Sequence, residues 1–168
     1  MTTETSGTGI PVPVEEMANM LFAATQEVFT SMLGSELSRL PDPPEIQPAL
    51  FDGVISLVGL AGALIGNGSV VCTAEAACDM SSRMLMTEFK NVDDQVLDSL
   101  GEIANMVIGG FKNLLEPSTG HLQMSIPSVI YGKNIASRDS KAGVAIGVCC
   151  GFPGGEFTVK VRLAVARE

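Results

Sequence analysis

One long amphipathic segment, residues 93–116, constrains the fold of this chain more than any other. Its apolar residues recur at the spacing of one helix face, at positions 96, 97, 100, 103, 104, 107, 108, 111, 114 and 115. Polar or small residues fall on the opposite side, at positions 95, 98, 102, 105, 109, 112 and 116. The pattern predicts a helix that begins near Asp93 or Asp94, whose carboxylates suit a helix N-terminus, and runs to about Glu116.

The remaining elements predict an α+β fold. A first long helix is expected from Val14 to Leu33, followed by a proline-rich connector from Pro41 to Pro48 and a short helix over residues 74–87. Strands are expected near residues 50–58, 62–73, 121–131, 142–150 and 156–165, with Gly-rich turns between the first two. This order favours an antiparallel sheet with the two long helices packed on one face. Residues 1–9 are expected to form a flexible tail, and residues 10–168 one domain.

Composition excludes several classes of function. A net charge of −9 leaves no excess of Lys and Arg for nucleic acid, and it disfavours an anionic membrane surface. No segment is long and apolar enough to span a bilayer and no basic leader is present, so a cytoplasmic location is expected. The four cysteines fit no zinc or redox spacing; Cys149 and Cys150, in an expected strand, should point to opposite faces. The low charged fraction, 17%, suggests that another subunit covers part of the surface.

The polar stripe of the 93–116 helix carries a candidate site. Glu102 and Asn105 are three residues apart and therefore share a face, and Asp98 lies one turn earlier. A carboxylate beside a neutral carboxamide is suited to binding a cation and orienting a water molecule. The small residues Gly109 and Gly110 are expected to let the backbone of another protein approach closely.

The first long helix contains an imperfect copy of the same motif. Glu16 and Asn19 match Glu102 and Asn105 at an offset of 86 residues, and the surrounding apolar stripe matches as well. Pro41 lies as far beyond Asn19 as Pro127 lies beyond Asn105. The pattern predicts two duplicated half-domains. The copy differs at Val12, which stands where the second half has Asp98.

Two stretches together resemble the CheX family of chemotaxis phosphatases, which is related to CheC and FliY. They are GEIANMVIG at residues 101–109 and SIPSVIYGKN at residues 125–134. The family pattern is Asp or Ser, three residues, Glu, two residues, Asn, and a Pro about two dozen residues later. Asp98, Glu102, Asn105 and Pro127 match it.

The resemblance implies a CheC/CheX-like fold and hydrolysis of the aspartyl phosphate of a CheY-like response regulator. Glu102 would bridge the lysine of the regulator, and Asn105 would position the attacking water. Asp98 and Pro127 would support the motif, and Glu16 and Asn19 form a candidate second site. The resemblance also implies a homodimer, no metal or cofactor of the chain's own, and Mg²⁺ on the regulator.

Two other functions stay open at this point. A non-catalytic CheC/CheX-like module could bind a response regulator or a flagellar or signalling partner without hydrolysing anything. A dimerisation or scaffolding domain is the other alternative. The intact Glu102–Asn105 pair favours the enzyme, because a binding module has no need of the carboxamide.

Overall fold

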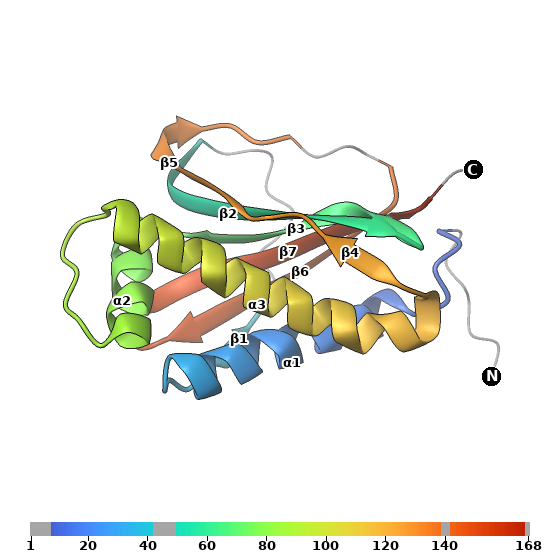
Figure 1. Cartoon of the computed structure of the whole chain (residues 1–168), viewed down its shortest axis with the longest axis horizontal. Coiled ribbons are helices and arrows are strands. Elements are labelled where there is room, and N and C mark those ends of the chain that lie inside the picture. Colours follow the sequence, from blue (N-terminus) through green and yellow to red (C-terminus); the bar gives the residue numbers. More distant parts are fainter. Residues whose placement is uncertain (1–7, 42–49, 139–141, 167–168) are drawn as a thin grey trace.

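A computed structural model of the chain describes residues 8–41, 50–138 and 142–166 (Figure 1). The predicted proline-rich connector from Pro41 to Pro48 lies outside the described residues after Pro41, as does most of the predicted tail over residues 1–9. The elements are α1 (Val14–Met32), β1 (Ser38–Leu40), β2 (Phe51–Gly62), β3 (Leu64–Cys72), α2 (Ala74–Leu85), α3 (Asp94–Thr119), β4 (Leu122–Met124), β5 (Ser128–Ile135), β6 (Val144–Phe152) and β7 (Gly155–Val165).

The strands form a seven-stranded antiparallel sheet, and α1 and α3 lie together across one face of it (Figure 1). The strand order is β1-β6-β7-β3-β2-β4, and β5 also pairs with β2. The predicted α+β architecture is therefore confirmed. Helix α3 packs over β2 and β3, whereas α1 packs over β6.

Helix α3 forms where its periodic pattern predicts. The side chain of Asp93 accepts a hydrogen bond from the Val96 amide at 2.9 Å and caps the N-terminus. The helix continues to Thr119, three residues beyond its predicted end, although Pro117 has no amide hydrogen to donate. Pro117 cannot donate the usual bond to the carbonyl four residues earlier, and the helix ends two residues later, where the Gly120 amide donates to the Glu116 carbonyl at 2.9 Å.

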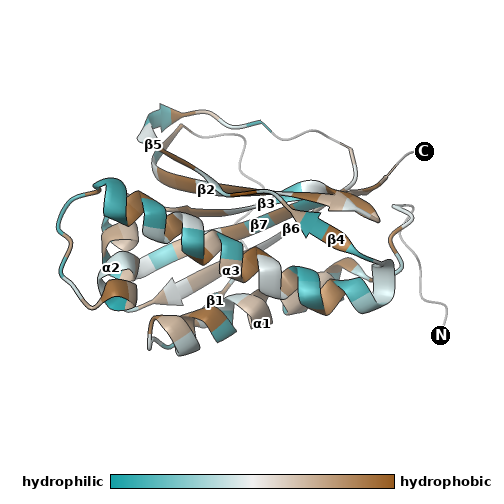
Figure 2. Cartoon of the chain, in the orientation of Figure 1, coloured by the Kyte–Doolittle hydropathy of each residue, from teal (hydrophilic) through white to brown (hydrophobic). Residues whose placement is uncertain are grey.

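The core lies between the helices and the sheet (Figure 2). It begins at Ile10 and Val12, just after the predicted tail, and both are buried. Alternation along β6 buries Cys150 and leaves Cys149 partly exposed, so these two side chains point to opposite faces as predicted. Phe29 of α1 stacks on Phe157 of β7 with ring centroids 4.9 Å apart, which joins helix and sheet.

The Gly-rich run over residues 59–68 was expected to be a hairpin turn, and it does join the two antiparallel strands β2 and β3, but the turn is shorter than expected. The run is paired strand in both β2 and β3, and only Ala63 separates them. The glycines serve close packing instead: a Cβ on Gly68 would lie 2.4 Å from Ile108 Cδ1 of α3. Similarly, the single strand predicted over residues 121–131 is two strands, β4 and β5, which both pair with β2.

Strand pairing repeats in the two halves of the chain, as the predicted duplication requires. Each half contributes a long helix, an edge segment and a hairpin: α1, β1 and β2–β3, then α3, β4–β5 and β6–β7. The edge strand β1 pairs with β6 of the second half, and β4 and β5 pair with β2 of the first. The halves meet where β3 pairs with β7, so the sheet order is symmetric about that pair.

Candidate active site

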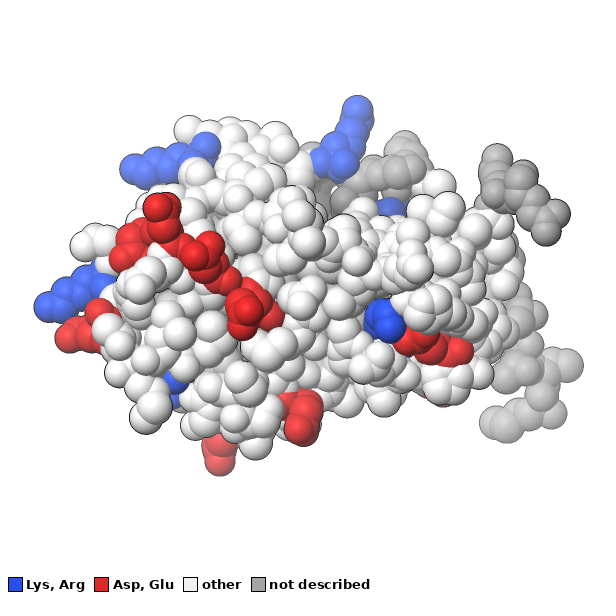
Figure 3. All heavy atoms as spheres, in the orientation of Figure 1, with Lys and Arg blue, Asp and Glu red and all other residues white. Residues whose placement is uncertain are grey.

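An open hollow of about 790 Å³ lies between the first half of α3 and the start of β5. It is lined by Asp94, Leu97, Asp98, Gly101, Glu102, Asn105, Pro127 and Val129. The structure thus brings the four motif residues, which were predicted from two distant stretches of sequence, to one place. Acidic side chains follow the first half of α3 at this surface (Figure 3).

Close packing fixes the direction of the motif side chains. On the inner side of α3, Leu100, Ile103 and Ala104 are fully buried, which sets the rotation of the helix about its axis. Gly101 is also buried, and a Cβ there would lie 3.5 Å from Pro127 Cγ. Pro127 therefore sets how closely the helix approaches the start of β5.

The pair itself is exposed and unengaged. Asp98, Glu102 and Asn105 are all exposed, and within the described parts of the chain none of their side chains makes a hydrogen bond or an ion pair. A carboxamide and a carboxylate held outward by a rigid helix are available to a partner molecule at little conformational cost.

The candidate second site differs in its neighbours. Glu16 and Asn19 are exposed on α1, but Asn19 Oδ1 accepts a hydrogen bond from Arg39 Nη1 of β1 at 2.9 Å. Val12, which replaces the aspartate of the motif, is buried in the core rather than placed on the surface. The second copy therefore lacks the aspartate one turn before its pair, and its carboxamide oxygen already has a partner.

Ser125 stands where the repeat places Arg39, and the sequence reading did not single it out. Its amide donates to the Gly59 carbonyl at 2.9 Å, and its Oγ accepts from the Gly59 amide at 2.7 Å. Two bonds to one residue of β2 fix the segment that leads to Pro127. The offset of 86 residues, applied two positions before the matched Pro41 and Pro127, would have identified this difference between the halves.

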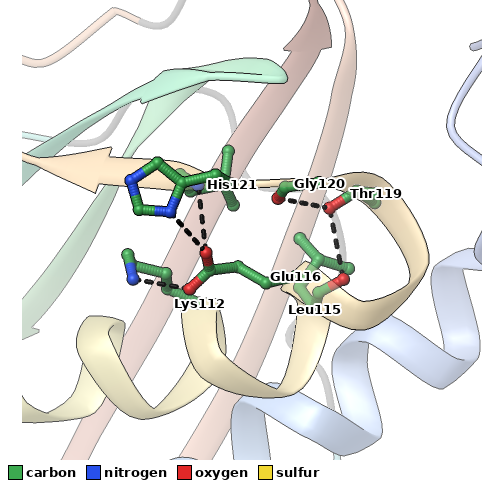
Figure 4. Close-up of polar contacts among 7 residues, drawn as sticks. Lys112, Leu115, Glu116, Thr119, Gly120 and His121 are labelled. Carbon is green, nitrogen blue, oxygen red and sulfur yellow. Dashed lines mark hydrogen bonds and ion pairs between the residues drawn. The ribbon is translucent and has the colours of Figure 1, made fainter.

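Farther along the polar stripe, the side chain of Glu116 makes polar contacts that connect the end of α3 to the start of β4 (Figure 4). Its carboxylate accepts from Lys112 Nζ at 2.6 Å, contacts His121 Nδ1 at 2.9 Å and accepts from the Leu122 amide at 3.3 Å. These contacts, led by the hydrogen bond from Lys112, lower the pKa of Glu116 from its ordinary value of 4.5 to about 2. The cluster fixes the turn between α3 and β4.

The expected approach of a partner backbone at Gly109 and Gly110 stays a prediction; both glycines are half-exposed, and both also pack inside the molecule. A Cβ on Gly110 would lie 3.2 Å from Ala24 Cβ of α1, and a Cβ on Gly109 would lie 3.4 Å from Met124 Cε of β4. The sequence pattern shows that small residues occupy these positions of the helix, but it does not show which neighbouring residue leaves no room for a larger side chain.

The described residues contain no group of three or more His, Cys, Asp or Glu side chains arranged to hold a metal ion. In the same part of the chain, no helix is both long enough and apolar enough to cross a membrane.

The fold and the site together define an α+β domain that presents a carboxylate and a carboxamide from a long helix over an open hollow. The family model described as "Chemotaxis phosphatase CheX" matches residues 54–149. The chain therefore belongs to the CheX family. The matched segment contains Asp98, Glu102, Asn105 and Pro127.

Relatives and solved structures agree with this assignment. The CheY-P phosphatase CheX of Thermotoga maritima is 22% identical over 120 residues, which are 71% of this chain and 77% of that protein. The crystal structure of chemotaxis protein CheX from Vibrio vulnificus matches with a TM-score of 0.76 and 27% identity, covering 90% of this chain and 99% of that one. CheX in a complex with CheY, BeF3 and Mg²⁺ from Borrelia burgdorferi matches with a TM-score of 0.69 and 25% identity over 87% of this chain and 96% of that one.

Proposed function

We propose that this protein hydrolyses the aspartyl phosphate of a CheY-like response regulator. The observation that carries the proposal is the exposed, unengaged Glu102–Asn105 pair on a rigid helix beside an open hollow. Support comes from membership of the CheX family, from a relative named as a CheY-P phosphatase, and from a similar structure in complex with CheY.

In the proposed reaction, Asn105 enters the phosphorylation pocket of the regulator and holds a water by hydrogen bonds. The water oxygen attacks phosphorus in line with the bond to the aspartate oxygen. That bond breaks, and the products are the free aspartate and inorganic phosphate. A neutral carboxamide suits this task because it orients water without placing another negative charge beside the phosphoryl oxygens.

Glu102 is the docking member of the pair. Its carboxylate pairs with the active-site lysine of the regulator, which sets the register of α3 against the pocket. Asp98 adds negative charge to the same surface, and Pro127 holds the start of β5 against Gly101. The reaction uses Mg²⁺ that belongs to the regulator, and no metal ligand is assigned to this chain.

Two further features belong to this proposal. The protein acts as a homodimer in the cytoplasm, and its subunits pair through a free sheet edge. Strand β5 offers such an edge, because within the described residues it pairs only with β2. The Glu16–Asn19 pair is a remnant of the duplication, because Arg39 engages Asn19 and a buried Val12 replaces the aspartate.

The activity is tested directly by phosphate release. CheY-like receiver domains from the same genome are phosphorylated with acetyl phosphate and Mg²⁺, and their dephosphorylation is followed with and without the protein. We expect faster decay for at least one regulator, and loss of this acceleration with Asn105→Ala. Binding of a phosphorylated regulator with unchanged decay would instead establish the non-catalytic binding module.

A further inference from the structure

The short link between β4 and β5, residues 125–127, is held rigidly. Besides its two bonds to Gly59, Ser125 donates from Oγ to the Ile126 carbonyl at 2.9 Å. Pro127 then restricts the backbone through its ring. The conformation of this link is therefore set before any partner arrives.

The link runs beside the turn of α3 that carries Asn105. At one end, a Cβ on Gly109 would lie 3.4 Å from Met124 Cε; at the other, a Cβ on Gly101 would lie 3.5 Å from Pro127 Cγ. The chain from Met124 to Pro127 thus follows α3 backwards, from Gly109 towards Gly101. Asn105 lies midway between these two glycines, so Ile126 lies next to the turn that presents it.

Ile126 is 87% exposed although its backbone is fixed. A β-branched side chain on a fixed backbone has few rotamers to lose, so covering it costs little entropy and removes a large apolar surface from water. The exposed residues of α3 at the hollow are Asp94, Asp98, Glu102 and Asn105, whereas the apolar residues of its lining, Leu97, Pro127 and Val129, are half-buried. Protein interfaces commonly have an apolar centre within a polar rim, and the exposed Ile126 beside these polar groups fits that arrangement.

We infer that Ile126 is the apolar anchor that holds the phosphorylated regulator while Asn105 occupies its pocket. The inference rests on the proposed function and assigns a docking residue to it. A regulator whose pocket admits Asn105 covers the adjacent link, so Ile126 packs against an apolar patch beside the phosphorylation site. Glu102 then supplies register and charge, and Ile126 supplies affinity. Because one side chain provides most of the apolar contact, the dephosphorylated regulator leaves quickly.

The test is a steady-state comparison of Ile126→Ala with the unchanged protein, using a receiver domain phosphorylated with acetyl phosphate. We expect KM to rise about tenfold while kcat stays within about twofold, as expected when most of a buried isoleucine contact is removed. Ile126→Val, which keeps the branched shape, should restore most of the affinity. Ile65→Ala is the matched control, because Ile65 is 52% exposed on β3 and points to the face of the sheet opposite α3.

The outcomes separate the inference from the proposed function. An unchanged KM for Ile126→Ala, in a protein whose activity is still lost with Asn105→Ala, overturns the anchor and leaves the phosphatase in place. An equal rise in KM for Ile65→Ala also overturns it. A change from dimer to monomer on Ile126→Ala, measured by light scattering, would show that a second copy covers the residue instead. Failure of the unchanged protein to accelerate decay of any regulator overturns both.

Discussion

At the scale of single residues, Glu102 and Asn105 are neighbours on one helix face, but substitutions at the two positions are expected to change different kinetic constants. Asn105→Ala should lower kcat by about a hundredfold with little change in KM, because the water loses its orientation. Asn105→Asp keeps the shape and adds a charge, and it should be similarly impaired. Glu102→Gln should mainly raise KM. Steady-state phosphate release separates these effects, and identical kinetic changes for both positions would contradict the division of roles.

Asn19 provides a second residue-scale prediction. Because Arg39 engages its Oδ1 at 2.9 Å, Asn19→Ala should leave kcat/KM within about twofold of the unchanged protein, as is usual for a surface substitution away from a working site. Adding Asn19→Ala to Asn105→Ala should cause no further loss. A clear additional loss in the double variant would show that the first half of the chain also turns over substrate.

At the scale of elements, the contact between α3 and β3 depends on a missing side chain. Gly68→Ala should lower the free energy of unfolding by about 1–3 kcal/mol, because the new Cβ would lie 2.4 Å from Ile108 Cδ1 in a packed core. Ile108→Val removes that atom and should recover part of the loss. Urea denaturation measures both. Gly147→Ala is the matched control, since the nearest atom to a Cβ there is 3.8 Å away.

The junction of α3 and β4 should show a defined pH dependence. The folded-state pKa of Glu116, about 2, lies below its ordinary value of 4.5, so its carboxylate stabilises the fold above pH 4.5 and loses this effect as pH falls towards 2. Glu116→Gln should therefore have a lower Tm than the unchanged protein at pH 7. The two Tm values should converge between pH 4.5 and 2, which thermal melts over that range will test. A Tm difference that stays constant down to pH 2 would rule out this role.

At the scale of the whole molecule, burial should order the reactivity of the four cysteines. Burial raises the pKa of Cys72 and of Cys150 to about 12, so neither forms much of the reactive thiolate at neutral pH. Cys149 is partly exposed on the other face of β6 and should be alkylated first. Mass spectrometry after brief iodoacetamide treatment measures the order, with urea-unfolded protein as the control. Early labelling of Cys150 would contradict the packing.

Sequence patterns predicted most of this molecule where the signal lies within one element. The stripe of α3 identified both its buried face and the Glu102–Asn105 pair, since helix period and side-chain direction are coupled. Sequence patterns did not explain a residue whose identity is set by contact with another element. Gly68 is small because of Ile108, and Gly110 because of Ala24.

The residues of the candidate site also differ in whether they could be predicted from a single element of the sequence. Asp98, Glu102 and Asn105 could be grouped from helix spacing alone, and Pro127 came from the family resemblance. The bond between Arg39 and Asn19 could not be predicted, because it depends on how β1 lies against α1. The role of Ser125 at Gly59 depends in the same way on the pairing of β4 with β2.

The exchange of edge strands between the halves has a consequence for the history of the chain. A half on its own would leave its edge segment without a partner, because β1 needs β6 and β5 needs β2. A protein of half this length would therefore have to associate with a second copy of itself, and such a pair would carry two equal motifs. Joining the copies in one chain removes the need for both motifs while preserving the sheet. One motif can then change without loss of the sheet or of the other motif. The hydrogen bond from Arg39 to Asn19, which engages the carboxamide of the first motif, is a change of this kind.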